Sequence, residues 1–181
     1  MADTAQRTHP LHDRMHGASG VLIEPCAPAE RFSLRAAANV LAPIGSAIGL
    51  TMPEKIRTSA IANGKTALCI GPDEWLVIDE SGSDIAKALA GVEGHLLSCV
   101  DISHRNTAIR VSGPKAATVL ASGCPQDLRD RAFPVGTCAR TIYGKAEIAL
   151  LRESRDVWRI ECWRSFSDYV WKFLVDAAKS A

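Results

Sequence analysis

Three residues near the middle of the chain have the types that a charge-relay nucleophile requires. The stretch VDISHRNTAIRVSGP, residues 100–114, brings Asp101, Ser103 and His104 close together in sequence. A triad needs a serine–histidine and a histidine–carboxylate hydrogen bond, each about 2.6–3.2 Å long. On an extended strand, Asp101 and Ser103 share a face and His104 points the opposite way. The sequence also lacks a G-x-S-x-G elbow, so we predict a local hydrogen-bond cluster here rather than a hydrolase.

A group of histidines near the N-terminus could bind a metal ion. His9, His12 and His16 are separated by three and four residues, which would suit one face of a helix. Pro10 and Gly17 flank this pattern, however, and no cysteine or carboxylate cluster joins it. We therefore expect this segment to be a solvated tail without a metal site.

Loops that bind phosphate or dinucleotides are missing from the sequence. Neither G-x-x-x-x-G-K-[ST] nor G-x-G-x-x-G occurs, so we expect no nucleotide or flavin site of those kinds. The adjacent carboxylates Asp73 and Glu74 lie within GPDEW, where a turn between two strands is the simplest interpretation.

The composition is that of a globular protein without a nucleic-acid or membrane partner. The chain has 181 residues, 47% of them hydrophobic and 23% charged, and a net charge of +1. Nucleic-acid binding usually requires a concentrated basic patch, and a membrane span requires about 20 apolar residues. The six cysteines form no C-x-x-C pair, and the polar N-terminus lacks the apolar region of a signal peptide. We expect a cytoplasmic protein with reduced, mostly buried cysteines.

Hydrophobic periodicity predicts one α+β domain over residues 29–181, preceded by an extended tail over residues 1–28. Alternating or apolar runs predict strands at 31–36, 65–80 with a break at 71–74, 95–103, 107–113, 139–153 with a turn near Gly144, and 157–163. Helices are expected after Pro43, from the Ser83 cap to Gly91 or Gly94, and from Pro114 to Gly123. The mixture of hairpin-like strands and helices favours mixed or antiparallel sheets with flanking helices.

The final segment predicts a helix with a continuous apolar stripe. Ser165 and Asp168 have the spacing of a capping box. Trp171 falls outside the stripe and would face outward, where a loop or a partner protein would cover it. The stripe itself comprises Phe166, Tyr169, Val170, Phe173, Leu174 and Ala177.

Several blocks resemble the gamma subunit of heterotetrameric sarcosine oxidase. LCIGPDEWLVI resembles that family's G-P-D-E-W-L segment, and VDISHR leads into TAIRVSGP as it does there. The blocks GCPQDL, RAFPVGTCART and RSFSDYVWKFL follow in the family's order, so the resemblance runs from about residue 66 to residue 178.

The resemblance implies the fold of the folate-binding half of glycine-cleavage aminomethyltransferases. It also implies a subunit with no catalytic, cofactor or metal site of its own, which packs against an alpha subunit and through it joins beta and delta subunits. In such complexes FAD, FMN, NAD, tetrahydrofolate and zinc are held by the other subunits, and sarcosine is oxidatively demethylated to glycine with one-carbon transfer to tetrahydrofolate. A free-standing folate-binding protein of the same superfamily is the alternative.

Five residues within the matched blocks are candidates for an interface with a partner subunit. They share large aromatic or guanidinium side chains, which are enriched where proteins bind one another. The competing interpretation, that each packs or pairs within its own domain, stays open from sequence alone. The candidates are Trp75, Arg105, Arg129, Phe133 and Trp171.

Overall fold

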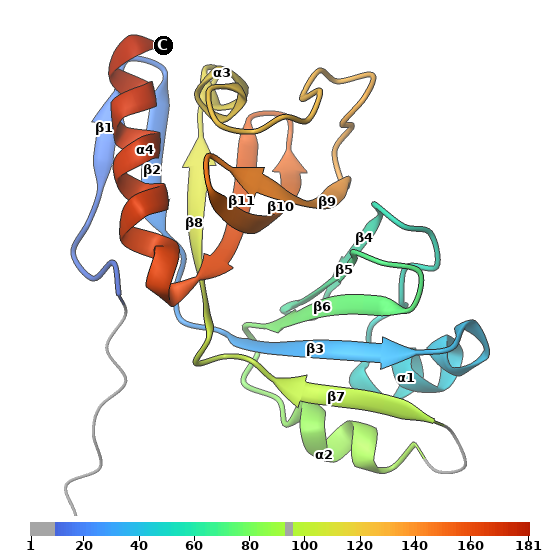
Figure 1. The fold of residues 1–181 in the computed structure, drawn as a ribbon. Coiled ribbons are helices and arrows are strands. Elements are labelled where there is room, and N and C mark those ends of the chain that lie inside the picture. Colours follow the sequence, from blue (N-terminus) through green and yellow to red (C-terminus); the bar gives the residue numbers. More distant parts are fainter. Residues whose placement is uncertain (1–9, 93–95) are drawn as a thin grey trace, which may run out of the picture.

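The larger of two β-sheets has six strands and is antiparallel throughout. The computed structural model describes residues 10–92 and 96–181. The order of the strands in this sheet is β1-β2-β8-β11-β10-β9 (Figure 1). Their bounds are β1 His16–Ala18, β2 Val21–Pro25, β8 Asn106–Ser112, β9 Cys138–Tyr143, β10 Ala146–Ser154 and β11 Val157–Trp163.

The smaller sheet has five strands, also all antiparallel. Its order is β4-β5-β6-β3-β7. The strands are β3 Glu30–Ala36, β4 Ser59–Ala62, β5 Lys65–Cys69, β6 Glu74–Asp79 and β7 Leu97–Asp101. Together the two sheets confirm the predicted α+β class with antiparallel sheets.

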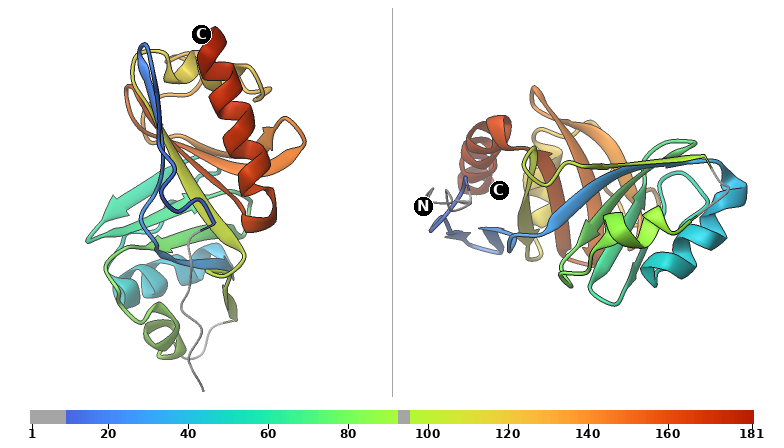
Figure 2. Two further views of the ribbon diagram at one scale, coloured as in Figure 1. Left: turned by 90° about the vertical axis from the view of Figure 1, so that its left-hand side faces the viewer. Right: turned by 90° about the horizontal axis from the view of Figure 1, so that it is seen from below.

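Each sheet has its own pair of helices, which lie at opposite ends of the molecule (Figure 2). α3 (Ala116–Ala121) and α4 (Ser167–Ser180) pack with the larger sheet, around a core that includes Trp158. α1 (Leu41–Ile48) and α2 (Ile85–Ala90) pack with the smaller sheet, around a core that includes Trp75. Two short 3-10 helices, Ala38–Val40 and Arg164–Phe166, precede α1 and α4. Among the described residues, no helix is long and apolar enough to cross a bilayer.

The two sheets meet through a third, smaller cluster of buried side chains. Leu76 and Ile78 from β6 belong to this cluster together with Leu151 from β10 and Cys138 from β9. A β-bridge between Thr58 and Thr137 and the backbone hydrogen bond from the Cys138 N–H to the Arg57 carbonyl extend the junction. Since both sheets contribute to one apolar layer, their relative orientation is fixed by packing.

The prediction of an extended tail up to residue 28 is wrong for residues 16–25. β2 pairs with β8, and its side chains Val21 and Ile23 are buried in the core of the larger sheet, as is Leu11. The segment VLIEP has the alternation of a half-buried strand, and Gly20 at φ 83° allows the turn from β1. The domain therefore begins before residue 29. His9 and the other residues up to 9 lie outside the described part.

The apolar stripe of the last helix is rotated by one position from the predicted one. α4 begins at Ser167, after a 3-10 turn, and buries Ser167, Val170, Trp171, Leu174 and Ala178. This set repeats with the same helical spacing as the predicted stripe but starts one residue later. Trp171 is consequently only 7% exposed, which corrects the prediction that it faces outward.

The predicted capping box is also absent. The hydroxyl of Ser167 donates to the Arg164 carbonyl oxygen at 2.7 Å, and no side chain caps the first turn of the helix. The Asp168 carboxylate instead pairs with Lys172 and with Arg14, each at 2.7 Å. The helix is therefore tied to the N-terminal segment that precedes β1.

At the other helices the sequence predictions hold to within a few residues. α1 begins two residues before Pro43, and Gly49 ends it at φ 70°. α2 is capped by Asp84, which accepts from the Lys87 N–H at 2.9 Å, because Ser83 is engaged with Asp79. α2 ends at Gly91; Gly94 and His95 lie outside the described residues.

Candidate functional site

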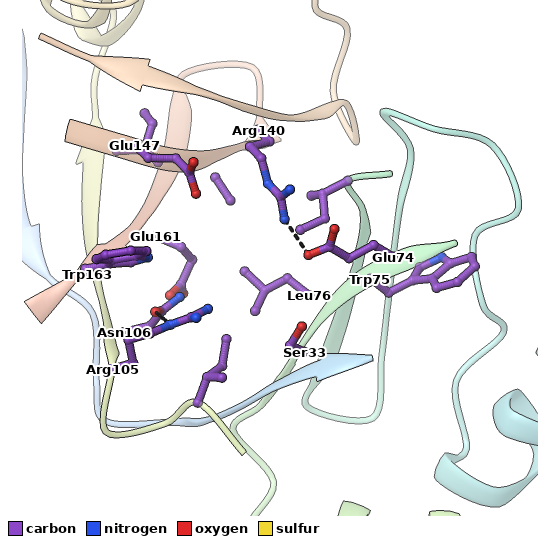
Figure 3. Close-up of a pocket in the computed structure, with 14 residues that line it drawn as sticks. Ser33, Glu74, Trp75, Leu76, Arg105, Asn106, Arg140, Glu147, Glu161 and Trp163 are labelled. Atoms are coloured by element: carbon purple, nitrogen blue, oxygen red, sulfur yellow. Dashed lines mark hydrogen bonds and ion pairs between the residues drawn. The ribbon is translucent and has the colours of Figure 1, made fainter. Parts of the chain in front are cut away.

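A cavity of about 50 Å³ opens where the two sheets diverge, and we call it the wedge (Figure 3). β6 and β3 of the smaller sheet form one wall, with Ser33, Glu74 and Leu76. β9, β10 and β11 of the larger sheet supply the other, with Arg140 on β9 and Glu147 on β10. The wedge is thus built from segments far apart in sequence.

An ion pair between Glu74 and Arg140 links the two sheets across the wedge. The Glu74 carboxylate, whose side chain is 13% exposed, accepts from Nη2 of Arg140 at 2.5 Å and from Nη2 of Arg35 at 3.1 Å. Glu74 sits at the GPDE turn, where the Ile70 and Gly71 N–H groups donate to the Glu74 carbonyl oxygen. The predicted turn is therefore confirmed. Its carboxylate has the added role of holding the strands of the two sheets together.

Behind the wedge lies a buried cluster of alternating charges. The Glu161 carboxylate on β11 accepts from Nε of Arg31 at 2.6 Å and from Nε of Arg159 at 2.9 Å, and all three side chains are at most 4% exposed. Arg159 also reaches Glu80 at 2.7 Å. Burial alone would lower the pKa of Arg159, but Glu161 and Glu80 outweigh it and the pKa is raised. Glu161 pairs with both arginines, although Nη2 of Arg159 is buried without a hydrogen-bond partner among the described residues. The pairs join β3 of one sheet to β11 of the other.

The Asp101–Ser103 pair forms the predicted local hydrogen-bond cluster, in the turn that follows β7. The Ser103 hydroxyl donates to Oδ1 of Asp101 at 2.5 Å and accepts from the backbone N–H of Arg31 at 2.8 Å. Ser103 is 4% exposed, whereas His104 lies on the surface. With its proton given to a carboxylate and its oxygen already bonded, Ser103 is not arranged as a nucleophile.

The cysteine thiols are also poorly suited to chemistry. All six are free, five of them are buried, and burial raises the pKa of each. The pKa of Cys138 and that of Cys162 reach about 12. At neutral pH these thiols are protonated, and the thiolate is the nucleophile and metal ligand. Among the described residues no three histidine, cysteine or carboxylate side chains are grouped as a metal site would require.

Three of the five predicted interface residues are buried in the chain's own cores. Trp75 is 1% exposed and donates its indole N–H to the Pro53 carbonyl oxygen at 2.7 Å, pointing away from the wedge (Figure 3). Phe133 is fully buried, with its ring centroid 5.2 Å from that of Trp158. Trp171 packs into the core of the larger sheet. These three side chains have almost no surface to offer a partner, so the interface prediction is wrong for them.

The two predicted arginines are exposed. Arg129 forms a bidentate ion pair with Asp127, with Nη2–Oδ2 at 2.5 Å and Nε–Oδ1 at 2.7 Å. This contact lowers the pKa of Asp127 to about 2. Arg105 lines the wedge, and its guanidinium lies 5.4 Å from the centroid of the Trp163 ring.

Sequence reasoning missed the aromatic residues that are on the surface. Trp163 and Phe166 are each 41% exposed, and their rings are 6.2 Å apart. The signal was present, because Trp163 has the opposite parity to Trp158, Ile160 and Cys162 on the same strand. A residue next to a buried set on a strand must face the other side of the sheet.

Solved structures of two kinds resemble this fold. The aminomethyltransferase T of the glycine cleavage system from Bartonella henselae superposes with a TM-score of 0.63 at 12% identity, over 84% of this chain and 45% of that chain. A chain of the heterotetrameric sarcosine oxidase from Corynebacterium sp. U-96, in complex with pyrrole 2-carboxylate, superposes with a TM-score of 0.84 at 28% identity, over 91% of this chain and 87% of that chain. The fold is thus shared with the aminomethyltransferase class.

Sequence comparison assigns the family. The sarcosine oxidase, gamma subunit family matches residues 34–180. The sarcosine oxidase subunit gamma of an Arthrobacter species is 31% identical over 138 residues, which are 75% of this chain and 68% of that protein. The corresponding subunit of Corynebacterium sp. strain P-1 is 32% identical over the same shares. The chain belongs to the sarcosine oxidase gamma subunit family.

Proposed function

We propose that this chain is the gamma subunit of a heterotetrameric oxidase that demethylates sarcosine to glycine. The observation that carries the proposal is the superposition of 91% of the chain, at a TM-score of 0.84, on a chain of a heterotetrameric sarcosine oxidase. The partners are then alpha, beta and delta subunits, with the alpha subunit in direct contact. We expect the complex to act in the cytoplasm, where free thiols such as the six cysteines of this chain persist.

The role of the chain in this complex is structural. Its residues of catalytic type are engaged in the fold: Ser103 is bonded to Asp101 and Arg31, and the thiols are held protonated by burial. FAD, FMN, NAD, tetrahydrofolate and zinc would be held by the other subunits. The chain contributes a rigid body with two sheets and a surface on which another subunit can pack.

Affinity purification tests this proposal. The tagged full-length chain, expressed in its own organism, is expected to carry the other three oxidase subunits with it in equal amounts. The complex should produce hydrogen peroxide when sarcosine is added, and the same organism lacking this chain should yield less assembled oxidase. Recovery of the chain alone would contradict the proposal, and so would tight tetrahydrofolate binding by the isolated chain.

A further inference from the structure

Three large apolar side chains and one arginine are exposed on or beside the strands of the larger sheet that line the wedge. We call Arg105, Ile142, Trp163 and Phe166 the rim of the wedge. Ile142 on β9 is 47% exposed and lies opposite Glu147 on β10 in the strand register. Trp163 ends β11, and Phe166 follows in the 3-10 turn before α4. The rim therefore combines Ile142 of β9 and Trp163 at the end of β11 with Arg105 just before β8 and Phe166 just before α4, and Arg105 and Trp163 line the wedge.

Trp163 differs from every other tryptophan of the chain. Trp75, Trp158 and Trp171 are at most 7% exposed, whereas Trp163 is 41% exposed and its ring lies beside that of Phe166 at a tilt of 50°. Tryptophan and arginine are the residues most enriched at the energetic centres of protein interfaces. Hydrophobic free energy scales with the apolar area that is buried, so covering a large exposed ring with a second protein is strongly favourable.

Arg105 is held in place yet lacks a carboxylate. Its guanidinium lies over the Trp163 ring, its Nε donates to Oδ1 of Asn106 at 3.2 Å, and its carbonyl oxygen accepts from the Arg164 N–H at 2.8 Å. Among the residues of the described ranges, none forms an ion pair with it. An arginine whose side chain is already ordered loses less entropy when it binds a carboxylate in a bidentate manner.

The other charges around the wedge already have partners, so they do not compete for that carboxylate. Arg140 is paired with Glu74, and Glu161 is neutralised by Arg31 and Arg159. Glu147 is the exception, since it is exposed at the far side of the opening from Arg105 (Figure 3). A complementary surface must therefore offer a carboxylate to Arg105 and a cationic group to Glu147, on either side of an apolar contact.

We infer that the rim is the docking site for a segment of a partner oxidase subunit. This segment places an apolar side chain against Trp163 and Phe166, a carboxylate on Arg105 and a lysine or arginine near Glu147. The inference rests on the proposed function, which supplies the partner, and adds the face and the chemistry by which it is held. The opposite charges of Arg105 and Glu147, on the two sides of the opening, fix the orientation of the bound segment.

The test compares how firmly variants of this chain hold the other subunits. The tagged chain is co-expressed with the complete oxidase, and the release of the other subunits from the immobilised complex is followed on dilution. Trp163→Ala and Arg105→Met are each expected to release them at least about tenfold faster, and Trp163→Phe should restore much of the retention. Ile61→Ala, at a 58% exposed apolar position on β4 away from the rim, should behave as the unchanged chain does.

The outcomes separate this inference from the proposed function. If the unchanged chain retains the subunits and both rim variants retain them equally well, the rim is not the docking site, while the proposed function stands. If the unchanged chain retains no oxidase subunit, the proposed function fails and the inference fails with it. Melting temperatures of the isolated variants identify any loss caused by unfolding, and Arg105→Met, which changes only an exposed side chain, then decides the result.

Discussion

Replacing Gly144 with alanine should destabilise the protein more than the same change at another left-handed glycine. Gly144 forms the β9–β10 turn at φ 59°, beneath the aromatic side chains of α4. A Cβ atom there would overlap the Tyr169 hydroxyl and would lie 2.7 Å from a ring carbon of Phe173. The Tyr169 hydroxyl also accepts the Lys145 N–H at 3.1 Å, so the clash acts on a bonded group.

The magnitude has two parts. The left-handed backbone costs an alanine about 1–2 kcal/mol, and forcing an extra carbon into a packed contact adds about 1–3 kcal/mol. Gly82 supplies the matched control, because its φ is 72° but no atom lies within 4 Å of the added Cβ. Gly144→Ala should therefore lower the free energy of unfolding by about 2–5 kcal/mol, and Gly82→Ala by about 1–2 kcal/mol.

Urea unfolding of the isolated chain, followed by tryptophan fluorescence, measures both changes. The shift in midpoint converts to free energy as long as the slope with denaturant is unchanged. If the two variants lose the same stability, the contact between the turn and α4 does not contribute as described, and the packing of α4 on this hairpin would have to be reconsidered.

Three further changes test the interior. Glu161→Gln leaves two buried arginines without their shared carboxylate and should lower the free energy of unfolding by about 3–5 kcal/mol, measured in the same urea assay. Trp171→Ala should lower it by about 3–5 kcal/mol through the cavity it leaves, and an unchanged midpoint would show that this ring is not packed as described. Asp79 accepts four hydrogen bonds from Ser81 and Ser83; burial alone would raise its pKa, but these bonds outweigh it and hold the pKa below the usual 3.8. The resulting stability is present above that pH and is lost as the pH falls through the folded-state pKa, so Asp79→Asn should flatten the acid limb of the stability profile, and an unaltered limb would refute the assignment.

Local patterns predicted most of the strands, because their alternation reflects which face is buried. RFSLRA, KTALCI, EWLVI and TAIRVS all lie within or across the strands observed. The break at Gly71–Glu74 and the turn at Gly144 were also correct, since both depend on residues whose backbone preferences are strong. The Asp101–Ser103 bond was predicted as a local polar cluster, and it forms in the turn directly after β7.

The errors arose where tertiary packing decides between two acceptable local choices. VLIEP is a short segment that follows a proline- and glycine-containing stretch, and its assignment as a strand depends on its pairing with β8, which the local sequence does not show. The predicted buried face of α4 was wrong because Phe166 belongs to the 3-10 turn before Ser167 and not to the helix. As a result, Trp171 is buried and Phe166 is exposed, the reverse of the prediction. The wedge itself could not be anticipated, since its walls come from two sheets whose mutual placement no local pattern encodes.

The path of the chain between the sheets has a consequence for how the molecule could be taken apart. All five strands of the smaller sheet lie between β2 and β8 in sequence, yet β2 and β8 are hydrogen-bonded neighbours. The segment that forms the smaller sheet begins with β3 and ends with β7, and these two strands are adjacent and antiparallel. Residues 30–101 are therefore an inserted module whose first and last strands are neighbours, and joining Pro25 to Asn106 by a short loop would turn β2 and β8 into an ordinary hairpin of the six-stranded sheet.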